Sequence, residues 1–179
     1  MVDPLFSTRG GNSNRRFSNH LKRKTVPSFK GQYEHSVDNK GRVAFPAKLR
    51  KLVNPEAQDK FTILRGLEPC LYLYPQDRWE QVENRLSKIN SFTHKGRTVV
   101  RNFLRYAEDL SLDNQNRISL PSGLMTYSQI DTAAVFIGMG DLIEIWSPDK
   151  LNEADNELSQ EYYHELFEQV MGDDHEQGD

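Results

Sequence analysis

The sequence contains the segment SVDNKGRVAFP at residues 36–46 and a second version of it, SLDNQNRISLP, at residues 111–121. Both versions have Ser, Asp, Asn, Arg and Pro at the same positions. The correspondence continues downstream, because residues 61–64 match 134–137 and residues 70–75 match 143–148 in character and order. Matching segments that keep their order along the chain indicate an internal repeat.

Each copy of the repeat predicts strand, tight turn, strand, short helix, strand, turn, strand and then a longer helix. The turn over residues 38–41 is polar and ends at Gly41, between two strand-like segments. In the second copy Asn116 replaces the glycine, and we expect the same turn because Asn is the commonest non-glycine residue at positive φ. Pro46 and Pro121 suit the first turn of a helix, so short helices are expected over residues 47–53 and 122–127.

Apolar residues at helical spacing predict longer amphipathic helices after each copy. One stripe consists of Trp79, Val82, Leu86 and Ile89, and the other of Leu151, Ala154, Leu158, Tyr162, Leu166 and Val170. A further helix near residues 95–107 is expected to link the two copies. We interpret these stripes as core or as contacts between subunits.

The net charge of −3 conceals a strongly polarised chain. Residues 1–30 carry seven Lys and Arg against one acid, and residues 31–105 carry fourteen against eight. Residues 106–148 carry one cation against six acids, and residues 149–179 one against eleven. The front half can therefore face a polyanion, and the acidic helix after residue 148 is expected to turn away from it.

Several classes of protein are excluded or disfavoured by motifs that are missing. One cysteine, Cys70, allows neither an intrachain disulfide nor a Cys-based zinc site, and we interpret it as inert core. Gly138 and Gly140 follow a predicted strand, but another strand comes next, which excludes a dinucleotide fingerprint. Glu108 and Asp109 are neighbours on a strand and point to opposite faces. His35 occupies the place of Leu110 in the second copy, which favours packing over catalysis. We therefore expect no enzyme, catalytic residue, metal, cofactor, small-molecule substrate or membrane span.

The basic residues around the first turn are the strongest functional signal. Lys40 and Arg42 flank Gly41, and Lys48, Arg50 and Lys51 follow on the predicted short helix, whereas the second copy keeps only Arg117. One interpretation is a structural ion pair across each turn, Asp38 with Arg42 and Asp113 with Arg117. The other is a nucleic-acid surface, which explains why one copy alone is surrounded by cations. The residues leave both open.

Taken in order, these segments closely resemble the MraZ family of bacterial transcriptional regulators over residues 29–171. The resemblance rests on two DxxxR motifs, Asp38 to Arg42 and Asp113 to Arg117, and on GQYEHSVD at 31–38, PAKLR at 46–50 and SLP at 119–121. It implies an α+β fold, a double swapped-hairpin β-barrel of the AbrB/MazE type formed by two internal repeats, with amphipathic helices after each. We expect a basic, DNA-facing first repeat over 29–106 and a second repeat with an acidic helix over 107–171.

The resemblance also implies a function. Family members form ring-shaped homo-oligomers and bind short direct repeats in double-stranded DNA upstream of the division and cell-wall gene cluster, including their own promoter. This places the protein in the cytoplasm, at the nucleoid. The expected DNA contacts are Arg42 with Lys40 and Gly41, and Lys48, Arg50 and Lys51 at phosphates; Asp38, Asp113 and Arg117 complete the motifs. The alternative is a protein-interaction or antitoxin-like module of the same fold without direct DNA readout.

The two ends of the chain lie outside the repeat. Residues 1–28 are polar and basic without periodicity, and we expect them to be disordered. They can be an expression leader, the product of an early start codon, or a basic arm that contacts nucleic acid. Residues 172–179 are expected to be a frayed acidic tail.

Overall fold

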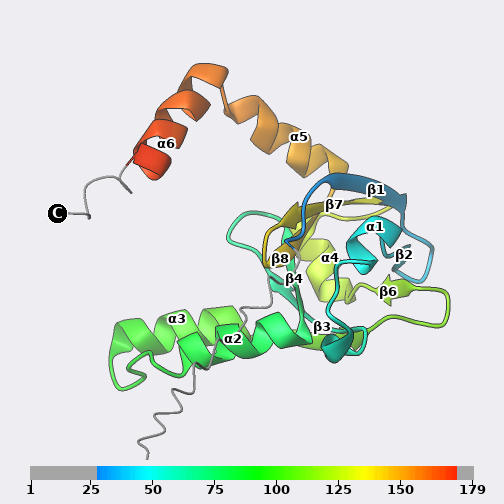
Figure 1. The fold of residues 1–179 in the computed structure, drawn as a ribbon, viewed down its shortest axis with the longest axis horizontal. Helices are drawn as coiled ribbons and strands as arrows, with labels where there is room; N and C mark the ends of the chain where they lie inside the picture. The colour runs from blue at the N-terminus through cyan, green and yellow to red at the C-terminus, as the bar shows by residue number, and fades with distance from the viewer. Residues whose placement is uncertain (1–27, 173–179) are drawn as a thin grey trace, which may run out of the picture.

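The structure is a computed structural model and describes residues 28–172, so the predictions for the basic extension and the acidic tail lie outside the described residues. The first repeat contains β1 (Gln32–Ser36), β2 (Arg42–Ala44), α1 (Ala47–Arg50), a 3-10 helix η1 (Pro55–Ala57), β3 (Lys60–Arg65), β4 (Leu71–Pro75), α2 (Gln76–Leu86) and α3 (His94–Leu104). The second contains β5 (Glu108–Ser111), β6 (Arg117–Ser119), α4 (Ser122–Ser128), β7 (Ala133–Met139), β8 (Leu142–Trp146), α5 (Pro148–Glu157) and α6 (Gln160–Gly172). The repeated order of elements is confirmed, and the fold is α+β (Figure 1).

The strands form an antiparallel six-stranded sheet in the order β1-β7-β8-β4-β3-β5 and a separate two-stranded ribbon of β2 and β6. The first strand of each repeat pairs with the other repeat, β1 with β7 and β5 with β3. The sheet is open at β1 and β5, where the resemblance implied a closed barrel. A bridge between Val37 and Val43 joins β1 to the ribbon at one residue, because the chain turns back directly after it.

The hydrophobic core lies between the ribbon and the sheet and draws on both repeats. Val43 and Ile118, at the centre of the ribbon, are buried against the sheet. Phe45 packs its ring 5.2 Å from Phe61 and 6.0 Å from Phe136. Since one of these partners belongs to each repeat, neither repeat can bury its apolar face without the other.

The helices of the first repeat are shorter than predicted. α1 ends at Arg50, and residues 51–53 form a turn. α2 ends at Leu86, so Ile89 of the predicted stripe lies beyond the helix. α3 packs on α2 through Trp79 and Phe103, whose rings stack 6.1 Å apart. These two helices project from the sheet as one arm (Figure 1).

The single long helix predicted after Pro148 is wrong in the structure. Leu158 takes an extended conformation at the end of α5. The Ser159 hydroxyl then accepts a hydrogen bond from the Tyr162 backbone N–H at 3.1 Å and begins α6. Leu151 and Ala154 of α5 pack on Val135 and Trp146, but α6 buries no residue fully and stands clear of the sheet (Figure 1).

Candidate nucleic-acid interface

The outward face of the β2–β6 ribbon carries both motif arginines. In the antiparallel register Arg42 lies opposite Ser119, Val43 opposite Ile118 and Ala44 opposite Arg117. Because side chains alternate across a strand and the central pair faces the core, the two flanking pairs face outward. Arg42 and Arg117 are thus diagonal neighbours on one surface, with the exposed small side chains Ala44 and Ser119 beside them.

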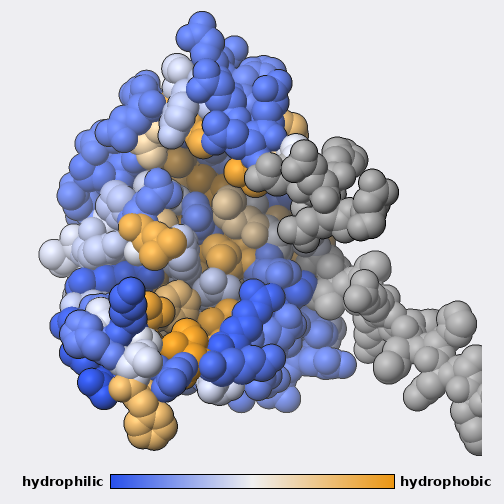
Figure 2. Space-filling view, turned by 90° about the vertical axis from the view of Figure 1, so that its left-hand side faces the viewer, coloured by the Kyte–Doolittle hydropathy of each residue, from blue (hydrophilic) through white to orange (hydrophobic). Residues whose placement is uncertain are grey.

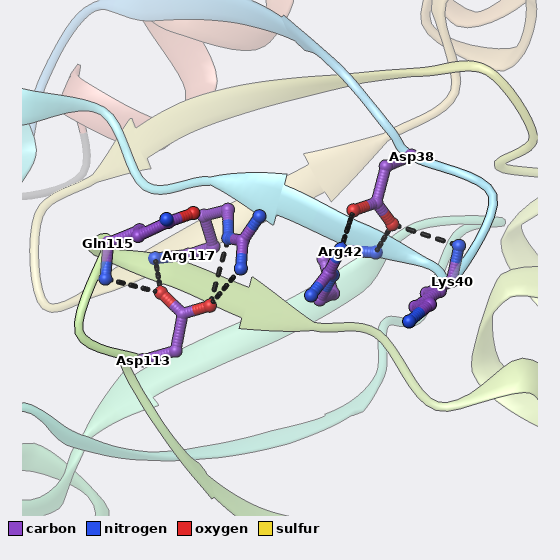
Figure 3. A network of polar contacts seen from close by, with 6 residues as sticks. All are labelled: Asp38, Lys40, Arg42, Asp113, Gln115 and Arg117. Atoms are coloured by element: carbon purple, nitrogen blue, oxygen red, sulfur yellow. Dashed lines mark hydrogen bonds and ion pairs between the residues drawn. The ribbon is translucent and has the colours of Figure 1, made fainter.

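The turn of the first repeat is organised by Asp38. One carboxylate oxygen accepts hydrogen bonds from the backbone N–H groups of Lys40, at 2.9 Å, and Arg42, at 3.0 Å. The other accepts from Nε of Arg42 at 2.8 Å and lies 2.6 Å from its Nη2 (Figure 3). These bonds, led by the one from the arginine side chain, hold the pKa of Asp38 well below its ordinary value and raise the pKa of Arg42.

The turn of the second repeat has the same construction. Asp113 accepts from the backbone N–H groups of Gln115, at 2.8 Å, and Arg117, at 3.0 Å. Its second oxygen accepts from Nε and Nη2 of Arg117 at 2.8 and 2.7 Å (Figure 3). The arginine side chain, then its backbone N–H, lowers the pKa of Asp113 to about 2. The predicted ion pair across each turn is present in both copies.

The glycine position of the turn has the same conformation in both repeats. Gly41 has a φ of 72° and Asn116 a φ of 58°, both in the left-handed region. Their backbone N–H groups donate to the carbonyls of Asp38 and Asp113 at 2.9 and 2.8 Å. The prediction that Asn116 keeps the turn geometry is confirmed.

The cations of the first repeat do not gather around one turn, which corrects the sequence-based picture. The first turn lies against α4, since the Leu120 backbone N–H donates to the Gly41 carbonyl at 2.9 Å, and α4 has no charged residue. The second turn lies beside α1, since the Phe45 N–H donates to the Asn116 carbonyl at 2.9 Å. The reason is that β2 carries the chain away from its own turn and toward that of the other repeat.

Lys40 and Arg42 therefore occupy one end of the ribbon, and Arg50 and Lys51 lie near the other. A surface hollow of ≈ 680 Å³ brings Arg50 and Lys51 together with Gln115 and Asn116. Arg50 is partly engaged, with its Nη2 3.2 Å from Asp59, whereas Lys51 is exposed. Lys48 lies elsewhere on α1, with its ammonium 5.8 Å from the centre of the Tyr33 ring.

Arg117, expected from the sequence to complete the second motif, lies on the same outward face as Arg42 and makes the same kind of ion pair with an aspartate of its own turn. The repeat contained the signal that was missed. Two equivalent strands that pair antiparallel bring the turn of each copy next to the helix of the other, so Arg50 and Lys51 lie beside the turn that precedes Arg117.

The other residues weighed from the sequence have structural surroundings. Cys70 is fully buried, and burial raises the pKa of its thiol to about 12. His35 meets the edge of Phe136, with ring centres 6.2 Å apart. Asp109 accepts a hydrogen bond from the Thr62 hydroxyl at 2.8 Å. Between residues 28 and 172, no three His, Cys, Asp or Glu residues are grouped as a metal site. Over the same residues, no helix has the length and apolar character needed to span a membrane.

Comparison with known proteins gives one consistent result. The sequence model of a family described as "MraZ protein, putative antitoxin-like" matches residues 28–102 and again residues 103–172. A relative from Syntrophomonas wolfei, named "Transcriptional regulator MraZ", is 40% identical over 143 residues, which cover 80% of this chain and 96% of the relative. Relatives of the same name from Halothermothrix orenii and Clostridium tetani are 40% and 38% identical, covering 66% and 70% of this chain and 80% and 85% of their own lengths.

Proposed function

The chain belongs to the MraZ family, and from this premise we propose that it is a transcriptional regulator that binds double-stranded DNA through the outward face of the β2–β6 ribbon. The observation that carries the proposal is the pair of arginines on that face, each oriented by an aspartate of its own turn. The name of the relatives supports a role in transcription, and the shape and charge of the ribbon support DNA as the ligand.

The dimensions and side chains of the ribbon suit a groove of DNA. A two-stranded ribbon fits into the major groove, and the small side chains of Ala44 and Ser119 allow the backbone to come close to the bases. Asp38 engages the Nε edge of the Arg42 guanidinium, which leaves the N–H groups of the Nη1–Nη2 edge for the two acceptors of a guanine. Because the ion pair already orders the arginine, little conformational entropy remains to be lost on binding.

Cations at both ends of the ribbon supply phosphate contacts in this proposal. Lys40 is exposed at the first turn, and Lys51 is exposed beside the second turn with Arg50 behind it. Lys48 adds a further charge on α1. The acidic arm of α5 and α6 projects from the side of the sheet away from the ribbon, so its negative charge does not oppose DNA at this face (Figure 1).

The finer features implied by the family belong to the same proposal. We infer a double swapped-hairpin arrangement, supported by the exchange of β1 and β5 between the repeats. We also propose that copies assemble into a ring that engages several short direct repeats at once, in the promoter of the division and cell-wall gene cluster. Linking weak modules in this way raises their effective concentration, so tandem repeats bind far more tightly than one. Such a regulator acts at the nucleoid in the cytoplasm.

The proposal is tested by fluorescence anisotropy with duplexes that carry the direct repeats found upstream of the protein's own gene, and with scrambled duplexes. Arg42→Ala and Arg117→Ala should each weaken binding to the repeat duplex by roughly 5- to 150-fold, the value of one bidentate base contact. Arg42→Lys keeps the charge but loses the planar fork, and we expect it to behave like Arg42→Ala. The control is Arg85→Ala. Arg85 is an exposed arginine on α2, and we expect this variant to bind both duplexes as the wild type does.

The phosphate contacts have a different signature. Lys51→Ala should weaken binding to both duplexes about equally and reduce the slope of log affinity against log salt by about one. Wild-type binding by folded Arg42→Ala and Arg117→Ala proteins would refute the ribbon as the reading surface. If the wild-type protein does not bind the repeat duplex at low salt, the result favours the antitoxin-like alternative over DNA binding.

A further inference from the structure

The apolar face of α6 has no partner within the part of the chain that the structure describes. Tyr163 and Phe167 lie one helical turn apart with ring centres at 6.2 Å, and both are about half exposed. Val170, which is 71% exposed, lies on the same side of the helix, seven residues after Tyr163. Several large apolar side chains together on an exposed helix are typical of a contact surface for another molecule.

Charge distinguishes α6 from α3, the second helix of the α2–α3 arm. α6 contains Glu161, Glu165 and Glu168 but neither Lys nor Arg. In contrast, residues 94–105, which include α3, contain Lys95, Arg97, Arg101 and Arg105 without any acid. The two helices are therefore complementary in sign.

The α2–α3 arm also exposes apolar side chains among its cations. Phe92, in the connection between the two helices, is 95% exposed, and Val99 on α3 is 54% exposed. This arm lies on the side of the sheet away from the ribbon, so its cations are not part of the proposed DNA surface (Figure 1). They are therefore free to face an acidic surface of another molecule.

The two arms project on the same side of the molecule but at opposite ends of it (Figure 1). Seen from that side, hydrophobic residues gather in the hollow between the upper and lower parts of the surface, whose outer regions are mostly hydrophilic (Figure 2). A second molecule thus meets apolar surface inside the hollow and charged surface around it, which is the usual anatomy of a protein interface.

We propose that α6 of one copy packs against the α3 side of the α2–α3 arm of the next copy. This inference builds on the proposed assembly into a ring but does not depend on DNA binding. A pairing of α6 with α6 is disfavoured because it sets two acidic helices side by side, whereas α3 offers the opposite charge. When α6 of one copy binds α3 of the next, an α3 surface stays free at one end of the chain of copies and an α6 surface at the other. Further copies can therefore add by the same contact, and the assembly closes into a ring if the rotation between copies allows it.

The test uses one charged substitution in each surface, at side chains exposed enough for the fold to survive. Phe167→Asp alters the α6 face and Val99→Asp alters the α3 face. Leu67→Asp is the matched control, because Leu67 is 89% exposed in the turn between β3 and β4. Circular dichroism establishes that each variant is folded, and native mass spectrometry measures the assembly.

We expect the wild type and Leu67→Asp to form the same assembly, and each of the other two variants to be monomeric. An equimolar mixture of Phe167→Asp and Val99→Asp should form heterodimers and nothing larger, because each pair retains one intact contact. The proposal is overturned if either interface variant assembles like the wild type, or if the mixture stays monomeric. Persistence of the Val99→Asp assembly with loss of the Phe167→Asp assembly would point to α6–α6 pairing instead.

A second readout separates this inference from the proposed function. The monomeric variants should bind a duplex with a single repeat as well as the wild type does, and lose only the extra affinity for tandem repeats. If DNA binding fails in the wild type while the mixture still yields heterodimers, the function is wrong and the interface stands.

Discussion

Replacing Gly41 by alanine should destabilise the protein, and the structure allows the size of the effect to be worked out. Gly41 has a φ of 72°, where an L-residue costs roughly 1–2 kcal/mol because its Cβ approaches the carbonyl oxygen. The new methyl would lie 3.1 Å from Sδ of Met125 and 3.3 Å from the carbonyl oxygen of Leu120. The flexible sulfur can move away, but the carbonyl is backbone and adds strain.

An effect on the unfolded chain offsets part of this backbone strain. Alanine reduces the conformational freedom of the unfolded chain, which stabilises the folded state by about 0.4–1 kcal/mol. We therefore expect Gly41→Ala to lower the free energy of unfolding by about 1–2 kcal/mol. For a folded region of this size the change corresponds to a fall in Tm of roughly 2–8 °C.

The equivalent position of the second repeat supplies the matched control. Asn116 already tolerates a φ of 58°, so Asn116→Gly should change the free energy of unfolding by less than about 0.5 kcal/mol. Urea and thermal unfolding are compared at one protomer concentration, because assembly makes stability depend on concentration. Unchanged stability in Gly41→Ala, or an equal loss in Asn116→Gly, would refute the role assigned to the left-handed turn.

Three further predictions concern the core, the cysteine and acid stability. Ile118→Ala should lower the free energy of unfolding, measured by urea denaturation, by about 2–5 kcal/mol, because Ile118 is fully buried. The control is Ser119→Ala at the exposed neighbouring position, which should change the free energy of unfolding little. Cys70 should resist a thiol reagent at pH 8 in the native protein and react fully in urea, since its pKa is raised to about 12; rapid labelling of the native protein would contradict its burial. The Asp113–Arg117 pair should contribute its full stability above the unfolded carboxyl pKa of 3.8 and lose that contribution as pH falls through about 2. Asp113→Asn should abolish this dependence, and an NMR titration of Asp113 at its ordinary pKa would count against the ion pair.

Local patterns predicted the parts of the site that depend on neighbours in sequence. The Asp38–Arg42 and Asp113–Arg117 pairs span four residues each, so a turn alone brings their charges together. The turn conformation at Asn116 followed from the same reasoning. The ends of helices were less predictable from local patterns. The single helix expected after Pro148 is interrupted because Ser159 caps a second helix. One serine within an apolar stripe is only a weak indication of such a cap.

The repeat, the order of strands and short helices, the two aspartate–arginine turns and the family all followed from the sequence, because each is encoded in contiguous residues and their spacing. Which turn each cation lies beside depends on how the two repeats pack together. Arg50 and Lys51 are nearer in sequence to Gly41, yet they lie beside Asn116. The physical reason is that the apolar faces of Val43 and Ile118 are buried by pairing β2 with β6 antiparallel, a contact 75 residues apart that reverses the direction of one repeat against the other.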